Sequence, residues 1–489
     1  MAESPRPKID RKARLQIPAQ PIQKHDPLER CNHWEEVVIG FSPDTAMVEA
    51  TRCIQCPAAP CIKACPVGND IPGALWLLEI GDFIGAANKF RETSTMPEVC
   101  GRICPQERLC EGDCVVGNNP KLNVRPVAIG RLEAFVADHQ RKTEGLPRPT
   151  IAESTGKSIA VIGAGPAGIT VAELLAPNGH SITILDNWPE PGGILRYGIP
   201  NFKMGKSIVE DKVALLRDLG VEFVGNVTIG RDKSVSQLLA EYDAVYLGHG
   251  ASIGASPNLP GEDLNGVYYA TDFLVRGNLS PEELPEGQKE KPKIGKRVVV
   301  IGGGDTSSDC VRTAVRLRAK EVTCLYRRTE SEMPGRVEER THAKEEGVKY
   351  VFLTAPLRFV GDESGNVTGV ECIQMELGEP DASGRPRPVQ KAGSEFIVTA
   401  DTVVMAVGYW ADEEFAQAVP GLGTQKSGRI VIDPDTGETS VPGLFAGGDS
   451  VRGADLVVTA VADGRRAAEA IDAYLQGLGS TAKAAPQMV

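Results

Sequence analysis

Cysteines gather in one part of this chain of 489 residues, where nine of the twelve lie between positions 31 and 114. The stretch RCIQCPAAPCIKACPVG supplies four of them, and CGRICPQERLCEGDC supplies four more: Cys53, Cys56, Cys61 and Cys65, then Cys100, Cys104, Cys110 and Cys114. Thiols at this density form disulfides, bind zinc or hold iron-sulfur clusters. The first group, which ends in Pro66, has the outline of the ferredoxin-type run C-x2-C-x2-C-x3-C-P with two extra residues in its middle.

The spacing of these cysteines favours clusters over zinc. Structural zinc sites of four cysteines usually use paired C-x2-C knuckles, and only Cys53 and Cys56 form such a pair here. Two structural zinc sites remain the alternative. Cys31 stands apart and is interpreted as a buried or idle thiol.

Charge and hydropathy limit the partners and the compartment. The chain contains 53 Lys and Arg and 65 Asp and Glu, which gives a net charge of -12. This negative charge argues against nucleic acid or an anionic membrane as the main partner. No stretch approaches the roughly 18 apolar residues of a membrane-spanning helix, and the basic, proline-rich start lacks the apolar core of a secretory signal. We therefore predict a cytoplasmic protein, in whose reducing surroundings disulfides are disfavoured.

Helical spacing dominates the region around the cysteines. Leu75, Leu78, Phe83 and Ala87 recur at near-helical intervals, and the segment VAIGRLEAFVADHQRK repeats the pattern. We expect a small helical domain packed around its cofactors, followed by a linker at the proline-rich segment EGLPRPTIAESTG.

A dinucleotide-binding fingerprint follows the linker in KSIAVIGAGPAGITVAELLAPNGHSITILD. Gly163 permits a tight turn, Gly165 lets the backbone approach a pyrophosphate, and Gly168 lets the helix pack closely on the strand. Asp186 ends the second strand, where an acidic side chain accepts hydrogen bonds from ribose hydroxyls. The order of strand, glycines, helix, strand and acid predicts a nucleotide site.

A second unit of the same kind begins at GKRVVVIGGGDTSSDC. Ser307 stands where a third glycine would be, and Arg327 and Arg328 end the second strand in place of the acid. Guanidinium groups there suit a ribose 2'-phosphate, so we expect this site to prefer NADP(H), the alternative being a pair of solvated arginines. After it, DTVVMAVGYW and VPGLFAGGDSVRGADLVVTAVADGRRAAEAI predict further strands and a helix, which suggests one dinucleotide domain inserted in another.

Together with the cysteine region, the paired fingerprints and the segments EPGGILRYGIPNFK and LFAGGDSVRGADLVVTAV resemble the glutamate synthase small-subunit family, from about residue 35 to 475. That family includes the large subunit of NADPH-dependent ferredoxin:NAD oxidoreductase and the amino-terminal part of dihydropyrimidine dehydrogenase. The resemblance implies an α/β fold with two Rossmann-like domains, one inserted in the other, preceded by an α-helical domain that binds two 4Fe-4S clusters. The expected division is a flexible amino-terminal arm (1–30), an α-helical iron-sulfur domain (31–150), the first part of the FAD-binding domain (151–285), the NADPH-binding domain (286–395), the second part of the FAD-binding domain (396–480) and a tail (481–489).

The resemblance also implies which residues hold the nucleotides. FAD would contact residues of the first fingerprint and of two later segments: Gly163, Ala164, Gly165, Pro166, Ala167, Gly168, Asp186, Gly193, Ile194, Arg196, Lys203, Gly448 and Asp449. NADPH would contact residues of the second fingerprint and its surroundings: Gly303, Gly304, Asp305, Thr306, Arg327, Arg328 and Gly408.

For the metals, the family pattern crosses the two cysteine groups. One cluster would take Cys53, Cys56, Cys61 and Cys114, and the other would take Cys65, Cys104 and Cys110. Its fourth ligand is Glu133 in our preferred reading, with Cys100 as the competitor.

The implied activity is electron transfer from NADPH through FAD to the clusters, with no protein acid or base required. Since no further catalytic domain is recognisable, we expect a redox partner subunit and a hetero-oligomer. The partner would be the glutamate synthase large subunit or, as the alternative, a ferredoxin-linked flavoprotein subunit of an electron-bifurcating enzyme.

Overall fold

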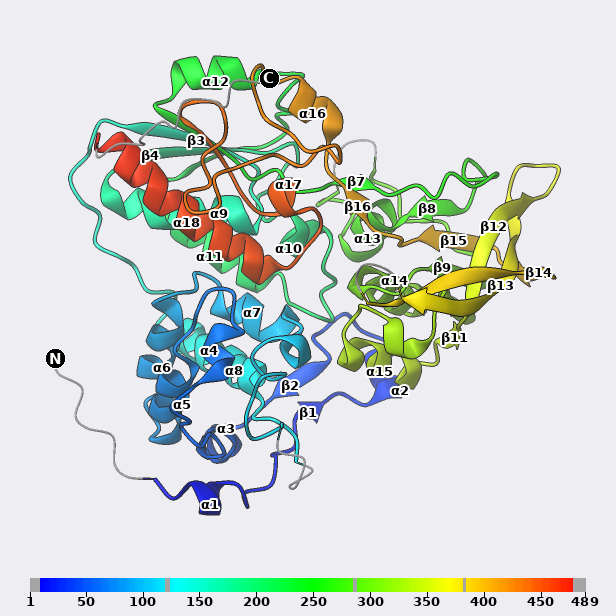
Figure 1. Ribbon diagram of the computed structural model, residues 1–489, viewed down its shortest axis with the longest axis horizontal. Helices are drawn as coiled ribbons and strands as arrows, with labels where there is room; N and C mark the ends of the chain where they lie inside the picture. Colours follow the sequence, from blue (N-terminus) through cyan, green and yellow to red (C-terminus); the bar gives the residue numbers. More distant parts are fainter. Residues whose placement is uncertain (1–8, 119–123, 285–287, 381–383, 478–489) are drawn as a thin grey trace.

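The computed structural model describes residues 9–118, 124–284, 288–380 and 384–477. Figure 1 shows a helical region at the bottom, drawn blue to cyan, and two regions with parallel sheets above it and to its right. The predicted tail, 481–489, lies outside the described residues.

Short helices build the amino-terminal region around the cysteines. Its main helices are α3 (Pro43–Thr51), α4 (Pro60–Lys63), α5 (Ile71–Glu79), α6 (Phe83–Arg91), α7 (Pro97–Ile103) and α8 (Ile129–Thr143). Side chains of Ser42, Asp70 and Asp82 cap α3, α5 and α6 by accepting backbone N–H groups of the first turn. The apolar faces of α3, α5, α6 and α8 meet in one core that includes Leu75, Leu78 and several cysteines. Val99 and Cys100 of α7 belong to a different core.

The segment before these helices is packed on the molecule from residue 9 onward, unlike the flexible arm expected over 1–30. It contains α1 (Arg11–Arg14), β1 (Gln23–Lys24), α2 (Pro27–Arg30) and β2 (Val38–Gly40). Arg14 donates to Glu79 at 2.6 Å, and Arg30, 1% exposed, donates to Glu346 at 2.8 Å. Buried ion pairs of this kind fix the segment, and the sequence alone did not reveal their acidic partners.

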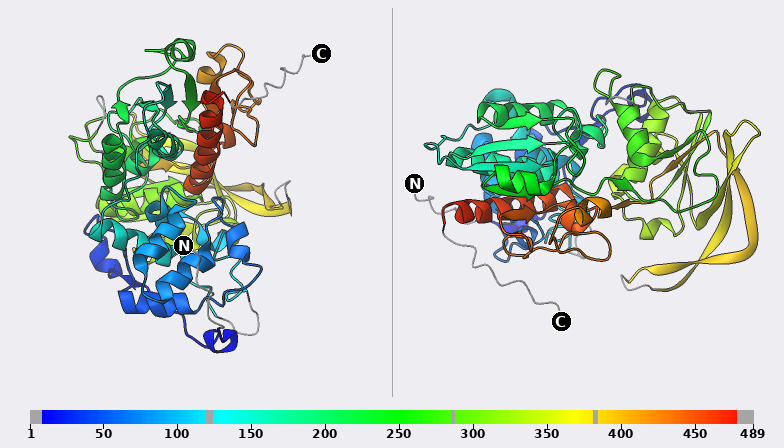
Figure 2. Two further views of the ribbon diagram at one scale, coloured as in Figure 1. Left: turned by 90° about the vertical axis from the view of Figure 1, so that its left-hand side faces the viewer. Right: turned by 90° about the horizontal axis from the view of Figure 1, so that it is seen from above.

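The first parallel sheet has the strand order β17-β6-β3-β4-β5. Its strands are β3 (Ser158–Ile162), β4 (Ser181–Leu185), β5 (Glu222–Val224), β6 (Ala244–Leu247) and β17 (Leu444–Ala446). The helices beside it are α9 (Pro166–Leu175), α11 (Ser207–Asp218), α12 (Val235–Glu241) and α18 (Val457–Leu475), of which α18 lies along one side of the sheet region in Figure 2. The chain therefore leaves this sheet after β6 and rejoins it at β17.

The second parallel sheet has the order β11-β10-β9-β15-β8. Its strands are β8 (Val267–Tyr269), β9 (Arg297–Ile301), β10 (Glu321–Leu325), β11 (Lys349–Val351) and β15 (Thr402–Met405), with helices α13 (Ala270–Asn278), α14 (Asp305–Arg316) and α15 (Val337–Glu345). The sheet extends beyond the expected range 286–395 on both sides, because β8 and β15 pair in parallel with its central strands. An apolar strand such as β15 suits either sheet, so its sequence pattern does not assign it.

A three-stranded antiparallel sheet projects from the second region, drawn yellow in Figure 1. It consists of β12 (Thr354–Gly361), β13 (Val367–Pro380) and β14 (Pro386–Thr399). The chain passes between the two parallel sheets twice, and the two connecting segments pair with each other. β7 (Ile253–Gly254) in the first segment pairs antiparallel with β16 (Tyr409–Trp410) in the second.

Candidate functional site

The first glycine loop joins β3 to α9 and combines tight packing with one open position. Gly163 has φ +98°, and a Cβ there would lie 2.5 Å from the carbonyl oxygen of Gly248. A Cβ at Gly168 would lie 2.0 Å from the carbonyl oxygen of Gly163. Gly165, in contrast, has no neighbouring atom within 4 Å of an added Cβ, so its side is open to a ligand. Pro166 begins α9, where its missing N–H costs no hydrogen bond.

Residues far apart in sequence converge on this loop. Asp186, directly after β4, accepts the N–H of Ala164 at 2.6 Å. Gly193, with φ +50°, approaches the loop so closely that a Cβ would lie 2.7 Å from the Cα of Gly165. Gly448, after β17, would place a Cβ 3.2 Å from that of Ala167. The structure thus brings the expected FAD residues of three segments to one place.

The other expected FAD residues surround that place. Ile194, which begins α10 (Ile194–Tyr197), is half exposed, and Arg196 donates to Glu283 at 3.5 Å. Asp449 begins α17 (Asp449–Arg452), and burial raises its pKa to about 6. Lys203 is buried and pairs with Asp309 of α14 at 3.1 Å, so it joins the first sheet region to the second.

The second glycine loop joins β9 to α14 and repeats the arrangement of the first. Gly302 has φ +150°, and a Cβ there would lie 2.2 Å from the carbonyl oxygen of Ala406, whereas Gly304 is open. Gly303 packs under the ring of Tyr326. The hydroxyl of Ser307, at the third position, donates to the carbonyl of Gly304 at 2.6 Å.

Further expected NADPH residues lie around this loop. Asp305 begins α14, and its carboxylate accepts the N–H of Arg336 at 3.0 Å. Burial raises the pKa of Tyr409, and the side chain of Thr306 is near enough to lower it in part, so the neighbouring Gly408 also lies near the start of α14. The two arginines after β10 differ: Arg327 is exposed, whereas Arg328 is buried and donates to the carbonyl of Pro386 at 2.7 Å.

The eight clustered cysteines form two groups that cross the two sequence runs. Cys53, Cys56, Cys61 and Cys114 make the outer group. Burial, together with the nearby thiols of Cys114 and Cys56, raises the pKa of Cys53 to about 11. Burial together with the thiols of Cys53, Cys114 and Cys56 raises the pKa of Cys61 to about 12. Four thiols that act on one another in this way must lie close together.

The inner group contains Cys65, Cys100, Cys104 and Cys110 with the carboxylate of Glu133. The thiol of Cys104 hydrogen-bonds with that of Cys100, which together with burial raises the pKa of Cys104 well above its usual range. Glu133 is buried, and its carboxylate accepts a hydrogen bond from the side-chain amide of Asn69 at 3.3 Å. Burial and the charge of Cys100 raise the pKa of Glu133 well above the usual range. The structure brings both candidates for the fourth ligand, Glu133 and Cys100, to this group.

Soft thiolates are the ligands that iron-sulfur clusters require, so the donor set of both groups fits such clusters. Within the described residues, no three His, Cys, Asp or Glu side chains are arranged to hold a metal ion. The two observations are compatible, because thiolates at the corners of a four-iron cluster are spread more widely than the ligands of one ion. Cys31 belongs to neither group and donates to the carbonyl of Pro27.

The two groups differ in the cores that they border. Cys100 and Cys104 belong to a core that also contains Ala164, Ala167 and residues of the first sheet, and Cys65 packs against it. Cys61, Cys110 and Cys114 belong to the core of the amino-terminal helices, against which Cys53 and Cys65 pack. The inner group therefore borders both cores, whereas the outer group borders the helical core.

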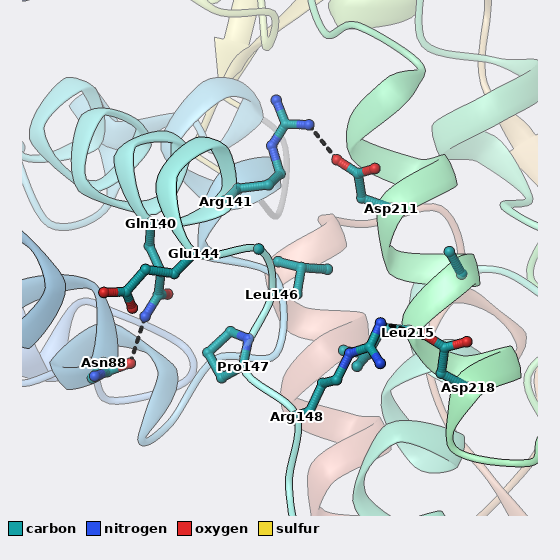
Figure 3. A pocket seen from close by; sticks show the side chains of 12 residues that line it. Asn88, Gln140, Arg141, Glu144, Leu146, Pro147, Arg148, Asp211, Leu215 and Asp218 are labelled. Atoms are coloured by element: carbon teal, nitrogen blue, oxygen red, sulfur yellow. Dashed lines mark hydrogen bonds and ion pairs between the residues drawn. The ribbon is translucent and has the colours of Figure 1, made fainter.

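A cavity of about 660 Å³ lies between α6, α8 and α11 (Figure 3). Arg141 of α8 pairs across it with Asp211 of α11 at 2.5 Å, and Arg148 pairs with Asp218 at 2.6 Å. None of the expected nucleotide or cluster residues lines it. The cavity separates two regions of the molecule and does not form the candidate site.

Sequence reasoning missed a turn beside the second glycine loop. Gly335 donates its N–H to the carbonyl of Gly303 at 3.0 Å, and Arg336 reaches from there to Gln106 in the inner cysteine run. The Pro-Gly step in SEMPGR signals a turn, but nothing in the sequence says which loop it would contact.

Among the described residues, none of the helices has the length and apolar character needed to cross a membrane.

Two family models match the chain. Residues 30–145 match dihydropyrimidine dehydrogenase domain II, 4Fe-4S cluster, and residues 157–464 match pyridine nucleotide-disulphide oxidoreductase. The NADPH glutamate synthase small chain of Escherichia coli (strain K12) is 42% identical over 90% of this chain and 94% of the relative. The NADP(+)-dependent formate dehydrogenase subunit beta of Moorella thermoacetica is 39% identical over 86% of this chain and 60% of the relative.

Among solved structures, Mycobacterium tuberculosis FprA in complex with NADPH superposes with a TM-score of 0.55 at 24% identity. The likeness covers 66% of this chain and 85% of FprA, and at that identity it shows the fold alone.

Proposed function

Because the chain belongs to the family of the NADPH glutamate synthase small chain and is an NADPH-dependent oxidoreductase, we propose that it passes electrons from NADPH to a partner subunit that makes glutamate. The observation that carries this proposal is the core that Cys100 and Cys104 share with Ala164 and Ala167, at the first glycine loop and the start of α9. Bound in these sites, NADPH would supply a hydride, FAD would divide the electron pair, and the clusters would carry single electrons.

The residues of the chain hold and orient these groups. Gly165 leaves room for a pyrophosphate at the start of α9, whose free N–H groups favour phosphate. Asp186, held beside the loop by the N–H of Ala164, would accept hydrogen bonds from the ribose. Gly304 leaves the same room before α14, and Arg327 would grip the 2'-phosphate. The buried pair of Lys203 and Asp309 joins the two nucleotide regions where flavin and nicotinamide would meet.

We further propose two 4Fe-4S clusters and one dinucleotide domain inserted in the other. The return of the chain to the first sheet at β17 supports the insertion. The mutual influence of Cys53, Cys56, Cys61 and Cys114 supports one cluster. Cys65, Cys104 and Cys110 would hold the other, with Glu133 as the fourth ligand and Cys100 as the competitor. The packing order then gives a path from flavin through the inner cluster to the outer one.

The partner in this proposal is a glutamate synthase large subunit, and the assembly is a cytoplasmic hetero-oligomer. A second candidate is an electron-transfer subunit of another redox enzyme, such as a ferredoxin-linked one. This second candidate is supported by the similarity to the formate dehydrogenase subunit beta. It is also supported by the similarity to the putative oxidoreductase AegA of Escherichia coli, which is 41% identical over 90% of this chain.

Anaerobic purification with iron, sulfide and flavin analysis tests the proposal. We expect about eight irons and one FAD per chain, bleaching of flavin and clusters by NADPH, and a much weaker response to NADH. Co-purification with a very large flavoprotein would support the glutamate synthase assignment, and a small subunit with a 2Fe-2S cluster would support the second candidate. Protein free of iron, or iron that stays oxidised while the flavin bleaches, would refute the electron path.

A further inference from the structure

We propose that Arg336 is a positioning residue that couples NADP(H) binding at the second glycine loop to the reduction potential of the inner cluster. This inference rests on the proposed function, since it assigns a role between the two sites. Its physical basis is a continuous chain of hydrogen bonds from the glycine loop, through one buried guanidinium, to the cysteine run that contains Cys100 and Cys104.

On the nucleotide side, Arg336 is fixed to the glycine loop by its backbone. Its N–H donates to the carboxylate of Asp305 at 3.0 Å, and the N–H of the preceding Gly335 donates to the carbonyl of Gly303 at 3.0 Å. Gly335 lies against the loop so closely that a Cβ would be 2.9 Å from the carbonyl carbon of Gly304. A nucleotide that orders residues 303–305 must therefore also order the turn that carries Arg336.

On the cluster side, the guanidinium of Arg336 reaches another domain. It donates to the carbonyl of Arg102 at 2.7 Å and to the side-chain oxygen of Gln106 at 2.9 Å. The Gln106 amide in turn donates to the carbonyls of Cys100 and Gly101, each at 3.2 Å.

The backbone of Gln106 also organises the inner cysteine run. Its carbonyl accepts the N–H groups of Leu109, Glu111 and Gly112, which fold the loop around Cys110. Gln106 is thus held from one side by Arg336 and holds the loop between Cys104 and Cys110 from the other.

Burial makes this link rigid and electrically effective. Arg336 is 3% exposed and Gln106 is 5% exposed, so water screens the guanidinium little. Its nearest carboxylates are those of Glu338 at 3.3 Å and Glu107 at 4.0 Å, and the carboxylates of Glu339 and Asp305 also act on it. A positive charge held beside the inner run stabilises the added electron, so a bound nucleotide that fixes Arg336 in place raises the potential of the inner cluster. By linkage, reduction of that cluster tightens NADP(H) binding by the same factor.

The test is an anaerobic redox titration of the full chain, with the inner cluster followed by electron paramagnetic resonance, with and without saturating NADP+. In the native protein we expect NADP+ to favour reduction about threefold, which is about 28 mV for one electron at 59 mV per tenfold. In Arg336→Gln we expect the nucleotide-dependent shift to vanish and the potential without nucleotide to fall by the equivalent of about tenfold, or 59 mV.

Arg318→Gln is the matched control. Arg318, which follows α14, donates to the side-chain oxygen of Asn32 at 2.6 Å and so also joins the second sheet region to the amino-terminal segment. Among the described residues it shares no hydrogen-bond or ion-pair partner with Arg336. This variant should keep the nucleotide-dependent shift. Gln106→Met, which removes the link from the cluster side, should lose the shift as Arg336→Gln does, and it serves as the test if Arg336→Gln fails to fold.

A nucleotide-dependent shift that persists in Arg336→Gln or in Gln106→Met would overturn the inference, as would a native protein without any shift. Failure of the proposed function would look different, because clusters would then be absent or would not be reduced by NADPH at all. A direct measurement of NADP+ affinity with the clusters oxidised and then reduced by dithionite must give the same factor as the potential shift.

Discussion

The two glycine loops share a backbone and differ in what surrounds them. Each follows a parallel strand and has a glycine at positive φ, Gly163 or Gly302, whose Cβ would strike the residue directly after a neighbouring strand. Each also has one open glycine, Gly165 or Gly304. Around the first loop, however, the chain closes in from distant segments at Gly193 and Gly448. The second loop is approached mainly from its own region, by Ala406, Tyr326 and Gly335. The first region reaches its helix α14 through the pair of Lys203 with Asp309.

We propose that this difference separates a nucleotide that stays bound, FAD at the first loop, from one that exchanges, NADPH at the second. A loop closed in by Gly193 and Gly448 would enclose much of its ligand. A loop approached mainly from one region would leave its ligand freer to enter and leave. The residues that follow β4 and β10 also fit two different nucleotides, since Asp186 suits a ribose hydroxyl and Arg327 suits a phosphate.

The largest test of this comparison is Gly165→Ala. Gly165 has φ -83°, which alanine adopts freely, and open space around its Cβ, so the apo fold should be unaffected. The methyl group would occupy the position of the pyrophosphate, and overpacking of about 1–3 kcal/mol weakens FAD binding by ~10–100-fold. We expect purified protein with little flavin, normal iron content and no response to NADPH, measured by absorbance and anaerobic titration.

Gly304→Ala is the matched change in the second loop and the control for the first. It too has ordinary backbone, with φ -88°, and open space. The variant should keep its full FAD content, while its affinity for NADPH falls by ~10–100-fold. If Gly304→Ala lost flavin, or if Gly165→Ala kept it, the assignment of the two loops would be reversed or wrong.

The loops themselves were predictable because a dinucleotide fingerprint is a local pattern. Strand, glycines, helix and the charged strand end all lie within some 30 residues, so the sequence predicts Gly163 and Asp186 as well as Gly302 and Arg327. The crossed grouping of the cysteines came from the family resemblance, and spacing alone would have kept the two runs separate.

What the sequence could not supply was contact between distant segments. Nothing local indicates that Arg30 is buried against Glu346, that β15 joins the second sheet, or that Arg336 reaches Gln106. Arg327 and Arg328 are adjacent and chemically alike, but in the bend that follows β10 the first is exposed and the second is buried. Such features depend on tertiary packing, which periodicity does not encode.

Arg327→Gln sharpens the comparison at the strand ends. If Arg327 binds the 2'-phosphate, its loss removes a charge-assisted hydrogen bond of about 1.5–3 kcal/mol. We expect kcat/KM for NADPH to fall by ~10–150-fold, with the value for NADH unchanged, in a steady-state assay with an artificial acceptor. Thermal stability should not change, because Arg327 is exposed. An equal loss with both nucleotides would show that Arg327 does not read the phosphate.

Arg328→Gln should have the smallest effect on nucleotide choice and therefore separates the two arginines. The guanidinium of Arg328 is buried and donates to the carbonyl of Pro386 in β14, so we assign it to the junction between the second parallel sheet and the antiparallel sheet. Leaving that carbonyl without its donor costs about 1–3 kcal/mol of folding free energy, which calorimetry would detect as a lower Tm. The ratio of kcat/KM for NADPH to that for NADH should change by less than about twofold, since 1.4 kcal/mol of binding is needed for a tenfold change. If Arg328→Gln instead lowered the preference for NADPH as much as Arg327→Gln, both side chains would reach the phosphate, and β14 would have to release Arg328 when the nucleotide binds.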